Sequence, residues 1–450
     1  MKVSEAQRPQ PSPVPSPPPW RLELAMYQAL TRLARPAAGV ILELRARQGK
    51  EDPLRRKERF GTASLQRPAG ALIWVHAASV GEANAVLPLI QGLRQRRPDA
   101  TVLMTTGTVT SASFVASRQP VGVIHQYVPL DSPAFVARFL EHWRPDLGVL
   151  TEQEIWPNLV VEASSRGIPL ALVNARMSDR SFARWQRRGG LARALFSRFN
   201  LVTAQNASLA ERFRELGAPL VFDAGNLKID APPLPVSETF RSDLKQFLGN
   251  RPRLVAASTH AGEEVVLAKV HKQLAARISG FCSLIAPRHP ERGNEIAAVI
   301  KASGLTVAQR SQGQPIRADT DIYIADTIGE LGTLYAIAPV AFIGGSLIPH
   351  GGQNPIEAVR HGAAVITGPH WHNFPDAYKA LLAAGGAIEV RTAEELATAV
   401  AELLTDDAAL ARSREHGEHA LVELSGALER TLACLLPMIP ETPRRSISAG

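Results

Sequence analysis

Three glutamates in the first half of the chain have the residue type and the placement that proton-transfer chemistry needs. Glu82 stands in the string SVGE, directly after the apolar run 72–76, and Glu152 and Glu154 directly follow the run 147–151. A carboxylate within hydrogen-bond reach of a hydroxyl can take its proton during nucleophilic attack. Close carboxylates also raise one another's pKa, an arrangement that recurs in active sites. If the strand continues that far, Glu152 and Glu154 would share one face.

Each of these carboxylates also has a purely structural interpretation. Glu82 would lie in the first turn of a helix, where a negative charge complements the helix dipole by about 0.3–1 kcal/mol. Glu152 and Glu154 would form a solvated surface pair. His76, inside the first apolar run, is expected to be a hydrogen-bonded core histidine rather than a catalyst. Position alone leaves these alternatives open.

The second half of the chain holds three segments that suit an anion. The string STH at 258–260 precedes a helix expected near Gly262, and Arg288 follows an apolar run and could fork onto a phosphate. The glycine-rich segment 344–357 leads into another helix. We expect its loop amides to meet phosphate and Glu357 to accept ribose hydroxyls, so these segments predict a nucleotide site. The chain carries neither a Walker motif nor GxGxxG after its first strand, which argues against an ATPase or a dehydrogenase.

Apolar runs that alternate with helix-length segments indicate βα units around parallel sheets. The strands of the first set are expected at 72–76, 101–106, 147–151, 170–174 and 201–205, and those of the second at 254–258, 283–287, 322–325, 340–343 and 364–367. The fold class is therefore α/β, with two Rossmann-like doubly wound domains facing a crevice at the carboxyl ends of their strands. The candidate residues above follow these strands, so this edge would position them.

A chain of 450 residues exceeds what one hydrophobic core usually supports, which also favours two domains. The proline-rich stretch around 230–237 reads as a break between them. The expected organisation is a disordered proline-rich arm at 1–20, an amphipathic segment at 21–60, a first domain at 61–229, a linker at 230–250, a second domain at 251–440 and a disordered tail at 441–450.

The segment 21–47 has the spacing of an amphipathic helix, bent near Pro36. Its apolar side comprises Leu22, Met26, Leu30, Leu33, Ala37, Ile41 and Leu44, and its polar side carries Arg21, Arg32, Arg35, Arg45 and Arg47. Uncharged stretches such as 36–42 are far shorter than the roughly twenty apolar residues of a membrane span. The helix could lie on a membrane or pack on the first domain, and both alternatives stay open.

The net charge of +8 favours an anionic partner, which nucleic acid, phospholipid or a phosphorylated substrate would each satisfy. Aromatic residues make up only 6% and the arginines are scattered without a recognised module, which argues against nucleic acid. The two cysteines, Cys282 and Cys434, form neither a disulfide framework nor a metal-ligand spacing.

Eight strings, in order, resemble the Kdo transferase family, which attaches 3-deoxy-D-manno-octulosonic acid (Kdo) to lipid A. They are HAASVGE (76–82), EQEIWPNL (152–159), VNARMSDRS (173–181), GNLKID (225–230), STHAGEE (258–264), PRHPER (287–292), DTIGELG (326–332) and GGSLIPHGGQNPIE (344–357). The resemblance covers about 24–436. It implies an inverting GT-B glycosyltransferase that moves Kdo from CMP-Kdo to a lipid A precursor of the lipid IV-A type in lipopolysaccharide biosynthesis.

The resemblance also implies roles for particular residues. Glu82 matches the proton acceptor, and Glu152 with Lys228 matches positions that stabilise the transition state. The positions expected to hold CMP are Pro287, Arg288, Ile328, Gly329, Glu330, Asn354, Pro355, Ile356 and Glu357. No cofactor and no metal are expected.

The implied partners are CMP-Kdo, a lipid A precursor and the anionic inner-leaflet membrane surface, with no nucleic acid. The implied location is the cytoplasmic face of the inner membrane, as a peripheral or monotopic protein. The chain departs from the family pattern at Gly107 and Val109, where Met and Pro are usual, and at Gln353, where histidine is common. The alternative is another GT-B enzyme, such as a UDP-sugar 2-epimerase, because the architecture is shared between functions.

Overall fold

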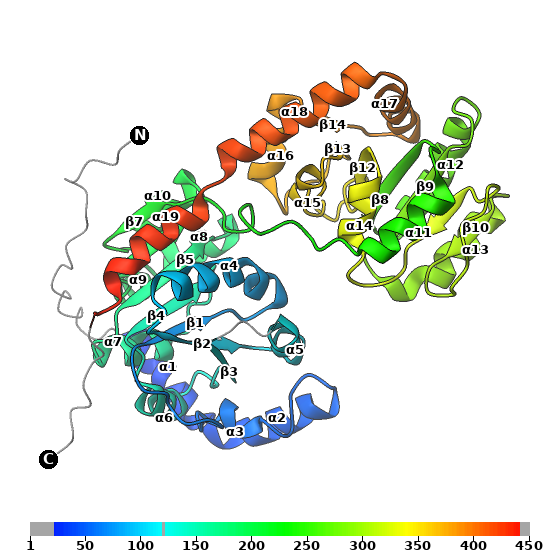
Figure 1. Cartoon of the computed structure of the whole chain (residues 1–450). Coiled ribbons are helices and arrows are strands. Elements are labelled where there is room, and N and C mark those ends of the chain that lie inside the picture. Colours follow the sequence, from blue (N-terminus) through cyan, green and yellow to red (C-terminus); the bar gives the residue numbers. More distant parts are fainter. Residues whose placement is uncertain (1–21, 119–121, 442–450) are drawn as a thin grey trace, which may run out of the picture. The chain divides into compact units, whose positions relative to one another are not determined.

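The computed structural model describes residues 22–118 and 122–441 and divides the chain into two compact units (Figure 1). Unit 1 comprises the chain up to Ala231 and from Ser425 onward, and unit 2 comprises Pro232–Leu424. Within the described residues, each unit is built on one seven-stranded sheet in which all paired strands run parallel. The expected α/β fold with two doubly wound sheets is confirmed. The expected arm at 1–20 and the tail from 442 lie outside the described residues.

The sheet of unit 1 has the strand order β3-β2-β1-β4-β5-β6-β7. Its strands are β1 (Leu72–His76), β2 (Thr101–Thr106), β3 (Val123–Tyr127), β4 (Leu147–Thr151), β5 (Leu170–Ala175), β6 (Leu201–Ala204) and β7 (Val221–Asp223). The winding direction reverses between β1 and β4, and in such sheets ligands bind outside the carboxyl ends of the strands at this switch point. The loops after β1 and β4 are the ones that carry Glu82 and Glu152.

Two hydrophobic layers cover the sheet of unit 1 because successive side chains of a strand point to opposite faces. Leu72 and Trp74 of β1 pack in one layer with Phe139, and Ile73 and Val75 pack in the other, where α4 and α19 lie side by side (Figure 1). The helices of unit 1 are α1 (Leu22–Leu33), α2 (Ala38–Arg47), α3 (Arg56–Arg59), α4 (Val80–Arg96), α5 (Val109–Arg118), α6 (Pro133–Trp143), α7 (Pro157–Ser165), α8 (Asp179–Arg187), α9 (Gly189–Phe196), α10 (Ala207–Glu215) and α19 (Ala427–Leu435), with the 3₁₀ turns η2 (Arg35–Ala37) and η4 (Leu436–Met438).

The sheet of unit 2 has the order β10-β11-β9-β8-β12-β13-β14, with its switch point between β8 and β12. Its strands are β8 (Arg253–Thr259), β9 (Cys282–Pro287), β10 (Val307–Gln309), β11 (Ile322–Ile324), β12 (Val340–Ile343), β13 (Ala364–Thr367) and β14 (Ala387–Glu389). Its helices are α11 (Glu238–Leu248), α12 (Glu263–Ala275), α13 (Gly293–Ala302), α14 (Leu331–Ile337), α15 (Ile356–Arg360), α16 (Pro375–Ala384), α17 (Ala393–Thr405) and α18 (Asp407–Leu424), with the 3₁₀ turn η3 (Pro290–Arg292).

The ten expected strands are all present, and their ends differ from expectation by at most one residue. The sequence pattern missed β3, β7, β10 and β14. All four are the outermost strands of their sheets. An edge strand has a neighbour on one side only and is shorter or less covered, so it lacks the continuous apolar run that marks a central parallel strand.

The boundaries of the two units differ from those expected in two places. The expected linker, 230–250, contains α11, which packs against α14 within unit 2. Residues from Ser425 onward were expected in the second domain but belong to unit 1. The Asp230 carboxylate accepts hydrogen bonds from the N–H groups of Gly426 (2.9 Å) and Leu428 (2.5 Å) and so caps α19. The sequence of α19 shows an ordinary amphipathic helix and does not reveal which core it covers.

The N-terminal helix bends at η2, where Pro36 predicts it. It packs on unit 1 through the buried Leu24 and Leu42, and the Tyr27 hydroxyl donates to Asp131 (2.9 Å). The expected apolar side faces outward instead: the exposed fraction is 76% for Leu22, 62% for Met26, 66% for Leu30, 79% for Leu33, 50% for Ile41 and 54% for Leu44. The helix therefore rests on the unit while its apolar stripe stays uncovered. Among the described residues, no helix has the length and the hydropathy to cross a bilayer.

Candidate active site

Glu82 lies in the first turn of α4, immediately after β1. Its carboxylate accepts hydrogen bonds from the Ala78 N–H (2.9 Å) and the Ser79 hydroxyl (2.8 Å), and Ser79 Oγ accepts one from the Glu82 N–H (3.3 Å). These reciprocal hydrogen bonds cap the N-terminus of α4, as the structural interpretation of Glu82 predicts. The Thr151 hydroxyl, at the end of β4, donates to the same carboxylate (3.0 Å). Glu82 therefore bridges the two strands of the switch point, which a capping residue alone need not do.

The surroundings of Glu82 make its carboxylate harder to ionise. Burial raises the pKa of Glu82, the hydrogen bonds from Ser79 and Ala78 lower it, and the negative charges of Glu154 and Glu152 raise it further. The net effect is a raised pKa. A general base is most effective when its pKa approaches the working pH, so this shift suits proton abstraction.

Glu152 follows β4 in a left-handed conformation, with φ of +50°. Such a conformation is costly for a residue other than glycine and persists only where the surroundings hold it. Here the Glu152 N–H donates to the Val173 carbonyl of β5 (3.0 Å). The buried carboxylate ion-pairs with Lys228 (Nζ–Oε1 2.6 Å) and lies 3.8 Å from the Arg176 guanidinium. The structure thus brings together Glu152 and Lys228, which are far apart in the chain.

Lys228 is positioned by the turn that follows β7. The side-chain oxygen of Asn174, at the end of β5, accepts a hydrogen bond from the Leu227 N–H (3.0 Å). The Asn226 side chain accepts another from the Lys228 N–H (3.0 Å). The first bond fastens the turn to the sheet and the second stabilises the turn itself, so the Lys228 ammonium is directed at the loop after β4.

Glu154 takes a different direction from Glu152. It accepts a hydrogen bond from the Trp156 indole (2.8 Å) and lies 3.6 Å from Nε2 of His76. His76 is fully buried, and its Nδ1 lies 3.0 Å from the Thr105 hydroxyl, so it is the hydrogen-bonded core histidine expected. The strand does not continue as far as a shared face of Glu152 and Glu154 requires, because β4 ends at Thr151 and the left-handed Glu152 turns the chain.

In unit 2, Arg288 and Glu357 lie close enough to interact. Burial raises the pKa of Glu357, and the hydrogen bond from Asn354 (3.1 Å) and the positive charge of Arg288 lower it, leaving a net rise. Arg288 is exposed and makes no ion pair with the described residues. Pro287 is the last residue of β9, and Pro355 precedes α15, whose first two residues are Ile356 and Glu357. Arg288 is therefore available to an anion at the end of β9.

The segment Ile328–Glu330 forms the loop before α14. Ile328 is 89% exposed and Gly329 has φ of +90°, a conformation that favours glycine. The Glu330 carboxylate is bound by Arg310 through Nη2 (2.7 Å) and Nε (3.1 Å). Because α14 packs against α15, this loop lies on an element adjacent to the one that carries Glu357.

The beginning of the glycine-rich loop holds an internal carboxylate. Glu263 is fully buried and accepts hydrogen bonds from four backbone N–H groups: His260 (2.9 Å), Gly345 (2.7 Å), Ser346 (3.1 Å) and Leu347 (3.1 Å). The carboxylate of Glu263 thus already binds three of the loop amides that were expected to meet a phosphate, and for the rest of the loop 344–357 this expectation stays a prediction. The sequence shows a glycine-rich loop but not the carboxylate that fills it.

Three histidines from the strings STH, PRHPER and GGSLIPHGGQNPIE lie at the carboxyl ends of β8, β9 and β12, and the sequence pattern did not predict that they are grouped. The rings of His260 and His350 lie 3.8 Å apart between centroids, and His289 lies 6.0 Å from His260. Gln353 Nε2 lies 3.2 Å from His260 Nε2. Burial, followed by the nearby positive groups including Arg288, lowers the pKa of His260 to about 4. A signal was present, since each of these histidines follows a predicted strand.

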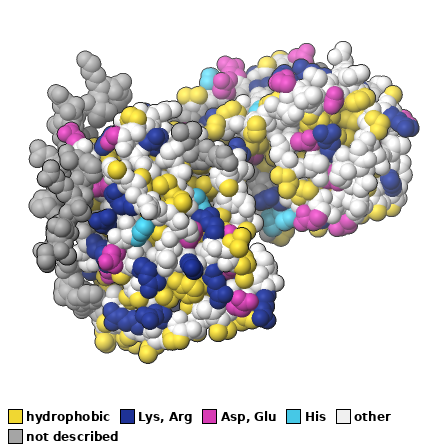
Figure 2. Space-filling view, turned by 60° about the horizontal axis from the view of Figure 1, so that its bottom comes forward, with side chains coloured by type: hydrophobic (Ala, Val, Ile, Leu, Met, Phe, Trp, Pro, Cys, Tyr) yellow, Lys and Arg dark blue, Asp and Glu magenta, His cyan; other side chains and the backbone are white. Residues whose placement is uncertain are grey.

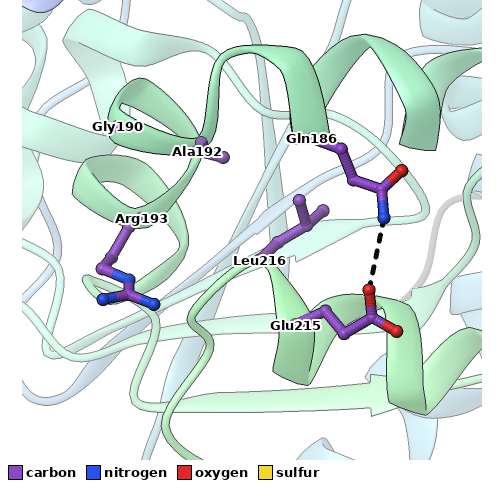
Figure 3. A pocket seen from close by; sticks show the side chains of 7 residues that line it. Gln186, Gly190, Ala192, Arg193, Glu215 and Leu216 are labelled. Carbon is purple, nitrogen blue, oxygen red and sulfur yellow. Dashed lines mark hydrogen bonds between the residues drawn. The ribbon is translucent and has the colours of Figure 1, made fainter.

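A cavity of about 390 Å³ lies elsewhere in unit 1, where α8, α9 and α10 meet (Figure 3). Its lining comprises Gln186, Gly189, Gly190, Ala192, Arg193, Glu215 and Leu216, none of which was expected at the site. The Gln186 side chain donates to Glu215 (3.3 Å). Over residues 22–118 and 122–441, no three or more His, Cys, Asp or Glu side chains are grouped to hold a metal ion.

Solved structures with the same fold include glycosyltransferases and epimerases. A glycosyltransferase from Rickettsia africae matches with a TM-score of 0.56 and 14% identity, over 83% of this chain and 100% of that chain. A UDP-GlcNAc 2-epimerase from Neisseria meningitidis bound to UDP-GlcNAc matches with a TM-score of 0.55 and 13% identity, over 81% and 98%. At these identities the likeness shows the GT-B type of fold alone.

Sequence relatives decide the family. The family model described as 3-deoxy-D-manno-octulosonic-acid transferase (kdotransferase) matches residues 54–231. A probable mitochondrial 3-deoxy-D-manno-octulosonic acid transferase from Arabidopsis thaliana is 39% identical, over 90% of this chain and 93% of the relative. A 3-deoxy-D-manno-octulosonic acid transferase from Haemophilus influenzae is 36% identical, over 84% and 90%. With the fold and these relatives in agreement, the chain belongs to the Kdo transferase family of glycosyltransferases.

Proposed function

We propose that this chain transfers Kdo from CMP-Kdo to a lipid A precursor of the lipid IV-A type, with inversion, in lipopolysaccharide biosynthesis. Membership of the Kdo transferase family supports the reaction. The observation that carries the proposal is the arrangement of Glu82, whose raised pKa suits a base, beside the ion pair of Glu152 and Lys228. Glu82 and Glu152 follow the neighbouring strands β1 and β4, so the proton acceptor lies near the positive charge that Glu152 holds through its ion pair with Lys228.

In the proposed reaction, Glu82 takes the proton of an acceptor hydroxyl while the hydroxyl oxygen attacks the anomeric carbon of Kdo. The bond from that carbon to the phosphate oxygen breaks, and CMP leaves with the electron pair. Attack opposite the leaving group inverts the configuration. Lys228 stabilises negative charge that develops in the transition state, and Glu152 holds Lys228 in position. No metal and no cofactor take part in this scheme.

Unit 2 is proposed to hold the donor. The exposed Arg288 guanidinium can bind the CMP phosphate through two parallel hydrogen bonds. Glu357, which Asn354 orients, can accept the ribose hydroxyls. The backbone of the loop Ile328–Glu330 is proposed to contact the nucleotide, because the Glu330 carboxylate is already bound by Arg310. The proposed site thus contains the residues expected from the sequence, but the loop Ile328–Glu330 contacts the nucleotide through its backbone rather than through the Glu330 side chain.

The exposed apolar stripe of α1 and α2 is proposed to dock the protein peripherally on the cytoplasmic face of the inner membrane. Leu22, Met26, Leu30 and Leu33 are all more than half exposed. Figure 2 shows Lys and Arg side chains gathered among hydrophobic ones on the face that is at the bottom of Figure 1, where α1–α3 lie. Such a surface suits a bilayer with anionic headgroups. A lipid acceptor has its acyl chains in that bilayer, which is why the transferase needs this contact.

The basic side of this helix is smaller than the sequence suggests. Arg45 is paired with Glu51 (2.8 Å) and Arg47 with Glu43 (3.4 Å). Arg32 is exposed and makes no ion pair among the described residues. We therefore assign most of the binding energy to the apolar stripe and expect high salt to release the protein only in part.

The test is incubation of the full-length protein with CMP-Kdo and a tetra-acylated lipid A precursor in buffer that contains EDTA, with the products weighed by mass spectrometry. A mass increase of one or more Kdo units supports the proposal. The alternative, a UDP-sugar 2-epimerase, shares the fold at a TM-score of 0.55. A titration that shows binding of UDP and none of CMP would favour this alternative and refute the proposed donor.

A further inference from the structure

Helix α8 presents a row of arginines to solvent. Arg180, Arg184 and Arg187 recur at spacings of four and three, so they lie on one face of the helix, and all three are exposed. We call these residues the arginine face. Phe182 and Trp185, on the other side, pack against the hydrophobic core of unit 1. Core packing therefore accounts for one side of α8 and leaves the arginine face unexplained.

The arginine face has no carboxylate partner in the described part of the chain. Asp179, the acidic residue of α8, is already paired with Arg212 (2.5 Å). None of Arg180, Arg184 and Arg187 makes an ion pair with a described residue. Three like charges on two turns of a helix repel one another. A bound anion would remove this repulsion.

Helix α8 begins beside the candidate catalytic residues of unit 1. It starts four residues after β5, the neighbour of the strand that leads to Glu152. Arg176, in the connection between β5 and α8, lies 3.8 Å from the Glu152 carboxylate. From Arg180 to Arg187 the helix rises about 10 Å. At its far end lies the cavity near Gln186, with Arg193 in its lining (Figure 3).

We propose that the arginine face binds the phosphate groups of the acceptor substrate. The inference rests on the proposed function, in which the acceptor is a phosphorylated lipid A precursor. The planar guanidinium group binds phosphate with two parallel hydrogen bonds, which makes arginine the suited residue. Arg176, just before α8, lies 3.8 Å from the Glu152 carboxylate, so the start of this helix is close to the proposed catalytic residues. This position favours the acceptor, rather than bilayer phospholipid, as the source of the phosphate.

The test compares the double variant Arg184→Ala/Arg187→Ala with the control Arg277→Ala/Arg412→Ala, which removes two exposed arginines from unit 2. Activity is measured in neutral detergent with the bisphosphorylated acceptor and with the same acceptor after phosphatase treatment. For the bisphosphorylated acceptor, we expect the first variant to raise KM about tenfold or more, since hydrogen bonds to charged groups are the strong ones. The kcat, the KM for CMP-Kdo and all values of the control should match wild type.

Three results would overturn the assignment. One is an unchanged acceptor KM in the first variant, and another is an equal rise for the acceptor without phosphates. The third is normal acceptor kinetics in detergent with lost binding to phosphatidylglycerol vesicles, which would assign the face to the bilayer. Binding of the bisphosphorylated acceptor is also measured without CMP-Kdo. If wild type transfers no Kdo, the proposed function fails, and this binding still tests the arginine face by itself.

Discussion

The substitution Glu82→Gln separates the structural role of this side chain from its chemical role. The carboxylate accepts hydrogen bonds from the Ala78 N–H and from the hydroxyls of Ser79 and Thr151. A glutamine keeps one oxygen acceptor, and a hydroxyl can rotate to accept from the new amide. We therefore expect to lose the equivalent of one hydrogen bond, about 1 kcal/mol of unfolding free energy. The removal of a carboxylate that Glu152 and Glu154 repel offsets part of this loss.

The effect of Glu82→Gln on transfer should be far larger than its effect on folding. An amide cannot accept the proton of the acceptor hydroxyl, so kcat should fall by about 10²–10⁴-fold. The wild-type rate should rise with pH as Glu82 loses its proton, with a midpoint above the ordinary value of a glutamate, because its pKa is raised. The variant should lack this limb of the pH profile.

Stability gives an independent measure of the same pKa. Because the folded state raises the pKa of Glu82, it binds this proton more tightly than the unfolded state does. The contribution of Glu82 to stability therefore falls as the pH rises from the unfolded pKa through the folded one. Relative to wild type, the variant should become more stable over this window in urea unfolding. An unchanged kcat with the pH limb intact would refute the assignment of Glu82 as the base.

Three further predictions concern other parts of the molecule. Arg288→Ala and Glu357→Ala should each weaken CMP binding about tenfold to a hundredfold in calorimetry while acceptor binding stays unchanged. Arg391→Ala is the control, and wild-type CMP affinity in both site variants would contradict the donor site. Leu30→Glu with Leu33→Glu should abolish sedimentation with anionic liposomes while deletion of residues 1–20 leaves it unchanged; a double variant that still sediments would place the docking surface elsewhere. Glu263→Gln should lower the unfolding free energy in urea by about 1–3 kcal/mol, since an amide donor would face backbone N–H groups. The control Glu418→Gln, at an exposed position, should leave the unfolding free energy unchanged. Equal stability of the two variants would show that the buried carboxylate does not hold the loop.

The central strands of both sheets could be predicted because their burial on both faces requires a continuous apolar run. The edge strands could not. In β3, for example, His125 and Gln126 interrupt the apolar pattern, since this strand has a neighbour on one side only. The sequence pattern also could not predict that the chain returns to unit 1 at α19, because the contact that fixes this helix is made by Asp230, about two hundred residues earlier.

The sequence predicts residues for the candidate site but not the contacts that these residues make. Glu82 and Glu152 follow strands, and that position is visible in the sequence. The left-handed conformation of Glu152 has no such signal, because no glycine marks it. Likewise, a glycine-rich loop predicts an anion but not that Glu263 of the same chain supplies it. Contacts between segments far apart in the chain depend on how the elements pack, and the local pattern of apolar and polar residues does not predict this packing.

The partners of the three glutamates support the proposal that Glu82, and not Glu152 or Glu154, acts as the base. Glu152 is paired with Lys228, at 2.6 Å. Burial acts to raise the pKa of Glu154, but the hydrogen bond and charge of His76, with the Trp156 hydrogen bond, outweigh it and lower that pKa. Glu82 is held by neutral donors, and its pKa rises.

Environments that separate the pKa values of neighbouring carboxylates also separate their roles. The lowered pKa of Glu154 makes it a weaker base than Glu82, whose pKa is raised. Protonation of Glu82 removes a negative charge that Glu154 and Glu152 repel. We therefore propose that Glu152 holds Lys228 in position while Glu82 takes the proton.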